Sequence, residues 1–118
     1  MGNAVTHFEI NGSNGKALGE FYAKTFDWHV DHNNPMDYGM VDTHAGKGIN
    51  GGIGQGQDPD QNWVTIYIEV DDLQATLAKI EKLGGKTVNP PMEIPGTGIS
   101  LAHFQDPEGH LIGLSKGM

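Results

Sequence analysis

The chain has 118 residues and a formal charge of −8, from 7 basic and 15 acidic side chains. This length fits one compact domain, or two half-size modules that share a core. All the basic residues are lysines, so the chain lacks the cation clusters of nucleic-acid-binding proteins and the arginines that grip carboxylates and phosphates. It has no cysteine and no apolar run near the ~20 residues that span a bilayer. We therefore expect a cytoplasmic protein that binds neither nucleic acid nor membrane, with a neutral or cationic ligand.

The first half of the chain predicts a strand, a helix and three further strands. The strand covers residues 5–10, where Thr6, Phe8 and Ile10 alternate with the other three side chains. A turn rich in glycine and asparagine follows, and then apolar residues at helical spacing, namely Ala17, Leu18, Phe21, Tyr22 and Phe26. The remaining short strands fit residues 28–31, 38–44 and 49–54.

The second half repeats this order after a polar stretch at 55–62, which we interpret as a linker. Residues 65–70 superpose on residues 5–10 with a shift of 60, which matches Glu69 to Glu9. The sequence Asp71-Asp72-Leu73-Gln74 predicts a capping box at the start of a second helix, and Gly84-Gly85 predicts its end. Short strands then fit residues 86–89, 99–105 and 110–115.

Each half therefore reads as strand, helix, strand, strand, strand, with module one at 1–54 and module two at 63–118. A unit of under ~60 residues buries too little surface to be stable alone, so the modules should share an interior. We expect one α+β domain over residues 1–118, in which two βαβββ modules in tandem form a curved mixed sheet around a groove, with the helices outside. The alternation turns two sets of side chains toward this groove: Val5, His7 and Glu9, and Thr65, Tyr67 and Glu69.

Several short motifs, mostly of turn and packing residues, occur in the order expected for such a paired-module chain. They are Phe21-Tyr22, Phe26-Asp27-Trp28, Glu69-Val70-Asp71-Asp72-Leu73, Leu83-Gly84-Gly85, Pro95-Gly96-Thr97-Gly98 and Phe104-Gln105-Asp106-Pro107-Glu108-Gly109-His110. With these motifs the chain resembles, over its whole length, the vicinal oxygen chelate superfamily of glyoxalases, bleomycin-resistance proteins and extradiol dioxygenases. The motifs report architecture better than chemistry.

The resemblance implies a divalent metal held by His, Gln or Glu side chains on the first and last strands of each module. Carried over residue by residue, those positions are Val5, Gly52, Thr65 and Gly113. Neither glycine nor valine has a donor atom, and a threonine hydroxyl is a poor ligand for a divalent ion. We therefore expect no metal cofactor at this site, although a register slip of two residues would bring His7 to a ligand position. The two glycines would leave the groove wide enough for a ligand.

The candidate groove residues are His7, Glu9, Trp28, Trp63, Tyr67 and Glu69. They could contact a ligand, and the two tryptophans could stack on a flat one, but burial alone also explains aromatic residues here. The glutamates favour a cationic or hydrogen-bonding ligand. We expect His44, His103 and His110 to be partly exposed hydrogen-bonding residues.

Three hypotheses follow from these residues. The first is a small-molecule-binding protein of the glyoxalase and bleomycin-resistance type, without the usual metal, that forms a homodimer like related short chains. The second is an enzyme, a metal-dependent lyase, isomerase or dioxygenase, with a divalent ion displaced to His7, Glu9 and Glu69. The third is a non-catalytic interaction module or accessory subunit.

Overall fold

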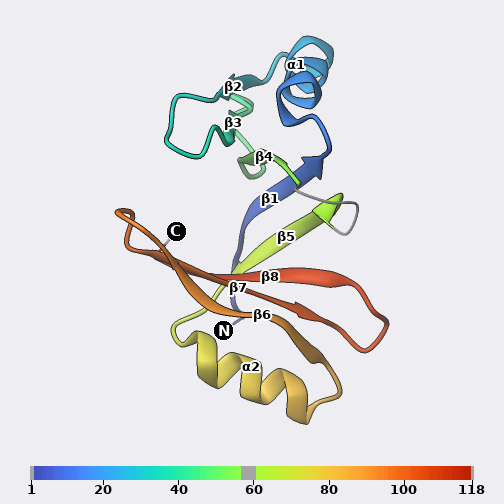
Figure 1. Ribbon diagram of the computed structural model, residues 1–118, viewed down its shortest axis with the longest axis vertical. Coiled ribbons are helices and arrows are strands. Elements are labelled where there is room, and N and C mark those ends of the chain that lie inside the picture. Colours follow the sequence, from blue (N-terminus) through green and yellow to red (C-terminus); the bar gives the residue numbers. More distant parts are fainter. Residues whose placement is uncertain (1, 57–60, 118) are drawn as a thin grey trace. The chain divides into compact units, whose positions relative to one another are not determined.

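The computed structural model describes residues 2–56 and 61–117, and it contains two helices and one mixed sheet of eight strands. The elements of the first half are β1 (Val5–Gly12), α1 (Gly15–Phe26), β2 (His29–Asp31), β3 (Gly39–Asp42) and β4 (Gly51–Gln55). Those of the second half are β5 (Val64–Glu69), α2 (Leu73–Lys82), β6 (Lys86–Ile94), β7 (Ile99–Gln105) and β8 (Leu111–Lys116). The predicted α+β class and the repeated βαβββ order are therefore confirmed (Figure 1).

The strands follow the order β2-β3-β4-β1-β5-β8-β7-β6. The last strand of each module runs parallel to the first, as β4 does beside β1 and β8 does beside β5. The other neighbours within each module pair antiparallel. By its contacts the chain forms two compact units, one of residues 7–65 and the other of residues up to Thr6 together with those from Ile66 onward.

In the unit of residues 7–65, α1 packs against β4, β2 and β3. The side chain of Asn14 caps the helix by accepting a hydrogen bond from the Ala17 N–H at 3.1 Å. Gly15 allows the helix to approach the strand closely, because a Cβ atom there would lie 3.1 Å from the carbonyl of Gly54. The start of α1 is thus held against the end of β4, next to the site described below.

In the other unit, α2 lies along β6, β7 and β8 (Figure 1). Its core consists of Val70, Leu73, Leu77, Ala102 and Leu114, with Ile68, Ile80 and Phe104 packed around it. The helix cap lies one residue later than the sequence predicts. The Asp72 carboxylate accepts from the Ala75 N–H at 3.0 Å, so Asp72, not Asp71, is the N-cap residue.

The strand β6 extends to Ile94, beyond the predicted end at residue 89, although it contains Pro90 and Pro91. It is an edge strand, so these prolines need not donate to a neighbour on the open side. Its pairing with β7 shifts register between Asn89 and Met92, which takes the proline pair out of the regular ladder. Part of the predicted linker, residues 57–60, lies outside the described residues. No described helix is long and apolar enough to cross a membrane.

Candidate functional site

The unit of residues 7–65 contains a buried carboxylate, that of Glu9 on β1, which is only 8% exposed. The hydroxyl of Tyr38 donates to Glu9 Oε1 at 2.9 Å, and the indole Nε1–H of Trp63 donates to Glu9 Oε2 at 2.7 Å. Both carboxylate oxygens therefore accept hydrogen bonds from neutral donors, which offsets the cost of burying the charge. Glu9 is fixed in position by residues from two distant parts of the chain.

The imidazole of His7, two residues earlier on the same face of β1, extends this network. His7 Nε2 lies 3.0 Å from the hydroxyl oxygen of Tyr38. Because Tyr38 has one hydroxyl hydrogen and donates it to Glu9, the imidazole Nε2–H must be the donor in this second bond. The order of donation is therefore His7 to Tyr38 to Glu9.

Burial lowers the pKa of His7 from its ordinary value of 6.5, and the smaller effect of the Glu9 charge raises it. Between the lowered pKa and 6.5 the unfolded chain binds more protons at this position than the folded chain does. We therefore predict that stability falls as the pH falls below about 6.5, and levels off below the folded-state pKa. Urea unfolding midpoints at several pH values check this. The dependence should weaken in His7→Gln, whose amide can still donate to Tyr38, and persist in His29→Gln, which changes an exposed histidine.

The loop before β3 holds Tyr38 in place through Asn34. The Asn34 side-chain oxygen accepts from the backbone N–H of Tyr38 at 2.9 Å and from that of Met36 at 3.2 Å. Its amide nitrogen donates to the Tyr38 carbonyl at 2.6 Å. Asn34 therefore closes the loop and orients the tyrosine.

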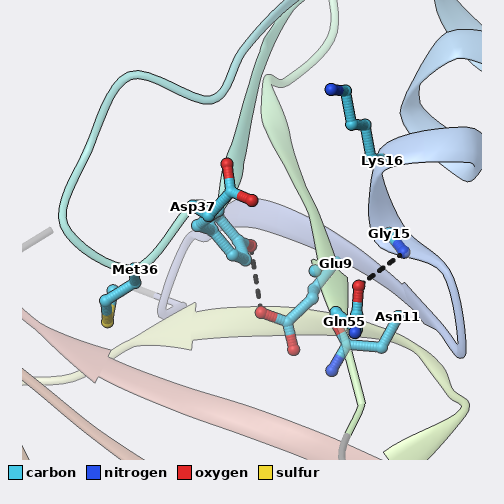
Figure 2. A pocket seen from close by; sticks show the side chains of 9 residues that line it. Glu9, Asn11, Gly15, Lys16, Met36, Asp37 and Gln55 are labelled. Carbon is cyan, nitrogen blue, oxygen red and sulfur yellow. Dashed lines mark hydrogen bonds between the residues drawn. The ribbon is translucent and has the colours of Figure 1, made fainter.

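A hollow of about 410 Å³ opens over this network (Figure 2). Its lining comes from β1, the start of α1, the loop before β3 and the end of β4, and it consists of Glu9, Asn11, Gly15, Lys16, Met36, Asp37, Tyr38, Gly54 and Gln55. Two carboxylates face one ammonium group in this set, so the lining is net acidic. A volume of this size accommodates a small organic molecule.

One acceptor in this lining lacks a hydrogen-bond partner among the described residues. The side-chain oxygen Oδ1 of Asn11 is buried over Gly54, where a Cβ atom would overlap it. At the edge of the same hollow, Gln55 Oε1 accepts from the Gly15 N–H at 3.3 Å, which joins β4 to the first turn of α1 (Figure 2). A ligand with an N–H or O–H group would provide the donor that Asn11 lacks.

The second unit has a separate polar row across its strands. Register places Tyr67 beside Gly113, Gly113 beside His103, and His103 beside Asn89. The Tyr67 hydroxyl lies 2.8 Å from His103 Nε2, and Asn89 Nδ2 lies 3.1 Å from His103 Nδ1. His103 is 7% exposed, so the expectation that it is partly exposed is wrong. Burial is possible because both ring nitrogens have partners.

Two other residues predicted from the sequence, Glu69 and Trp28, have different surroundings. Glu69 is exposed, and its backbone N–H donates to the Ala4 carbonyl at 2.9 Å. Trp28 stacks on Tyr22 with ring centroids 5.4 Å apart and lies 5.5 Å from Phe8. Phe8 alternates with His7 and Glu9 on β1, so Trp28 lies on the opposite face of this strand from the Glu9 network. His7, Glu9 and Trp63 are thus the predicted residues that the structure brings together in one network.

The strand register corrects the alignment of the two modules. Glu9 pairs with Gly52 on the parallel last strand of its module, and Tyr67 pairs with Gly113 in the same way. Glu9 is therefore equivalent to Tyr67, a shift of 58, and His7, not Val5, is equivalent to Thr65. The starts of the two helices agree with this register, because Gly15 and Leu73 also differ by 58.

With this register, the positions at which the resemblance implies metal ligands become His7, Gly52, Thr65 and Gly113. One imidazole with a hydroxyl and two glycines is a poor donor set for a divalent ion, so these residues do not fit the metal that the family implies. No three His, Asp or Glu side chains gather as metal ligands within residues 2–56 and 61–117. The displaced set predicted from the sequence, His7, Glu9 and Glu69, is therefore not found as such a group.

The two glycines do not widen the site, contrary to our expectation. A Cβ atom on Gly52 would overlap the ring and hydroxyl of Tyr38, and one on Gly113 would overlap the ring of Tyr67. The space that a longer side chain would use is therefore filled by tyrosine.

Comparison with known proteins places this fold among proteins made of paired βαβββ modules. Residues 4–114 match the sequence model of the glyoxalase/bleomycin resistance protein/dioxygenase superfamily. The chain belongs to this superfamily. A glyoxylase-like domain-containing protein of Didymella fabae is 24% identical over 112 residues, which are 90% of this chain and 88% of the relative.

Two solved structures show the same fold. A superfamily member from Vibrio splendidus 12B01 matches with a TM-score of 0.67 and 12% identity, over 97% of this chain and 98% of the other. The S115T variant of methylmalonyl-CoA epimerase from Streptomyces coelicolor, in complex with 2-nitronate-propionyl-CoA, matches with a TM-score of 0.69 and 19% identity, over 98% of this chain and 95% of the other. At these identities the likeness concerns the fold.

Proposed function

We propose that the chain binds a small organic molecule in the hollow over Glu9, without a metal ion, and that the ligand carries an ammonium or another hydrogen-bond donor. The observation that carries this proposal is the buried Glu9 carboxylate, held at both oxygens by Tyr38 and Trp63 beneath a hollow of about 410 Å³. A preorganised, desolvated acceptor is what a ligand-binding site requires for orientation and specificity.

The charges around the hollow support a cationic ligand. Glu9 and Asp37 outnumber Lys16, and the lowered pKa of His7 keeps its imidazole neutral near pH 7. The acceptor oxygen of Asn11 is suited to an N–H donor. A polyphosphorylated ligand such as an acyl-CoA is disfavoured, because the lining offers one lysine and the chain contains no arginine.

Three probes that share a ring and differ in charge test the proposal, namely benzylamine, benzyl alcohol and benzoate. We predict that benzylamine binds best, with a Kd in about the millimolar range for so small a molecule, and that benzoate binds least. Shifts of backbone amide signals at the hollow, followed by two-dimensional NMR during titration, give the affinities. Added salt should weaken benzylamine binding.

Two matched variants locate the effect. Glu9→Gln removes the buried charge and should reduce the preference for benzylamine over benzyl alcohol at least ~5-fold, the effect of about 1 kcal/mol. Glu20→Gln removes an exposed charge on α1 outside the hollow and should leave it unchanged. Equal binding of all three probes, or tightest binding of benzoate, would reject the proposal.

The assembly and location of the chain stay predictions. A homodimer is expected by analogy with short paired-module chains, and size-exclusion chromatography with light scattering tests it. We also propose a cytoplasmic location.

A further inference from the structure

Each half of the chain places a tyrosine ring over a glycine of its last strand. Tyr38 covers Gly52 on β4, and Tyr67 covers Gly113 on β8. In both cases a Cβ atom on the glycine would overlap the ring, so the tyrosine can take this position only because the residue beneath it is glycine. These two glycines stand at the positions where the family resemblance implies metal ligands.

The hydroxyl of each of these tyrosines is also paired with a histidine. Tyr38 Oη lies 3.0 Å from His7 Nε2, and Tyr67 Oη lies 2.8 Å from His103 Nε2. Both imidazoles are buried, at 8% and 7% exposure. Each half thus contains a tyrosine hydroxyl within hydrogen-bond distance of a buried imidazole, beside the glycine.

The two pairs are built from different elements. Tyr38 lies in the loop before β3 and its histidine lies on β1, whereas Tyr67 lies on β5 and its histidine on β7. The arrangement is therefore not a copy carried by the internal repeat. Two independent sets of residues produce the same local result, a phenol over a glycine and an imidazole bonded to the phenol.

We infer that Tyr38 and Tyr67 fill the space that metal-binding side chains would occupy at positions 52 and 113. In each half, a tyrosine hydroxyl hydrogen-bonded to a histidine then lies where the resemblance implies a metal ligand. In the first half, His7 is the one residue at an implied ligand position whose side chain binds metal ions well. Its Nε2 atom is hydrogen-bonded to the hydroxyl of Tyr38. The same hydroxyl donates to Glu9 Oε1. Tyr38 is therefore hydrogen-bonded to both the His7 imidazole and the Glu9 carboxylate. This inference does not depend on the proposed ligand.

The inference predicts that a metal site can be opened in the first half. Replacing Tyr38 by alanine removes the hydroxyl that His7 and Glu9 contact, and a histidine at position 52 would then project into the space that the ring leaves. Two imidazoles and one carboxylate are a ligand set suited to Zn²⁺ and Co²⁺. The double variant Tyr38→Ala/Gly52→His should therefore bind one equivalent of Co²⁺.

Cobalt is the probe because its visible absorption reports the coordination geometry, and isothermal titration with Zn²⁺ gives the affinity. We expect the double variant to bind Zn²⁺ at least ~100-fold more tightly than the wild type, and to lose this gain on the further change His7→Ala. Wild-type protein that binds one equivalent of Zn²⁺ or Co²⁺ in a way that depends on His7 would overturn the inference. A folded double variant without the gain would do the same.

Single glycine changes decide the question if the double variant does not fold. Gly52→Ala and Gly113→Ala should each lower the melting temperature by ~5 °C or more, because the added methyl group meets a tyrosine ring. Gly2→Ala, at a glycine with no atom near its Cβ position, should leave the melting temperature unchanged. Combining Gly52→Ala with Tyr38→Ala should cost less than the sum of the two changes. Additive costs, or harmless glycine changes, would contradict the geometry.

Discussion

Replacing Glu9 by alanine should lower the free energy of unfolding by about 3 kcal/mol, because two partly buried donors lose their acceptor at once. The Tyr38 hydroxyl and the Trp63 indole N–H both donate to this carboxylate, at 2.9 Å and 2.7 Å. An unsatisfied buried donor costs about 1 to 3 kcal/mol, and removal of the buried charge offsets part of the sum. Urea unfolding of wild type and variant, followed by circular dichroism, measures the difference.

The control for this change is Glu20→Ala on the exposed face of α1, which should change stability by less than about 0.5 kcal/mol. If Glu9→Ala were as stable as Glu20→Ala, the Glu9 carboxylate could not be the buried acceptor that we describe. The effect of Glu9 on stability can be separated from its effect on ligand binding by measuring benzylamine binding to Glu9→Gln. This variant keeps the shape of the side chain but removes its charge.

The second large effect is expected in the other unit, where Leu77→Ala should destabilise the protein by about 2 to 5 kcal/mol. Leu77 is 3% exposed on α2 and belongs to the core formed with Leu73, Ala102 and Leu114. Truncation removes buried apolar surface and leaves a cavity.

Leu83→Ala provides the matched control at the end of the same helix, because that leucine is 69% exposed. Its truncation should cost less than about 0.5 kcal/mol. Thermal unfolding of the two variants compares them directly. Equal costs would mean that α2 does not pack on β6, β7 and β8 through the face that contains Leu77.

Much of the fold can be predicted from the sequence because its signals are local. Alternating residues on the first strand of each half, apolar spacing on the helices and the glycines between elements fix the repeated βαβββ order. The extension of β6 past Pro90 and Pro91 is not predictable in this way, since it depends on β6 being an edge strand. The predicted N-cap of α2 differs from the observed one by a single residue, because Asp71 and Asp72 are adjacent and either carboxylate could cap a helix.

The candidate site is less accessible from sequence because its contacts are distant along the chain. Alternation puts His7 and Glu9 on one face of β1, but it gives no sign that Tyr38 and Trp63 hold the carboxylate. The lining residues Asn11, Lys16, Asp37 and Gln55 come from segments that meet only in the fold, so no local pattern in the sequence indicates them.

One signal could have indicated Tyr38. A glycine at a position where relatives carry a long side chain leaves a space that a close-packed interior has to fill, so the sequence raises the question of which residue fills it. Neither Tyr38 nor Tyr67 can be matched to its glycine without the strand register and the loop geometry. The same limit applies to His7. The internal repeat matches Thr65 to Val5, and only the observed strand register shows that Thr65 is equivalent to His7, two residues later.

The hydrogen bond from the Trp63 indole to Glu9 can be observed directly by NMR. Spectra of ¹⁵N-labelled protein should contain one indole N–H signal from Trp63 and one from Trp28, which the variant Trp63→Phe assigns. We predict that the Trp63 signal exchanges slowly with solvent and moves in both Glu9→Gln and Tyr38→Phe, while the Trp28 signal stays in place. A Trp63 indole hydrogen that exchanges as fast as an exposed one, and that ignores both substitutions, would contradict the existence of the Glu9 site.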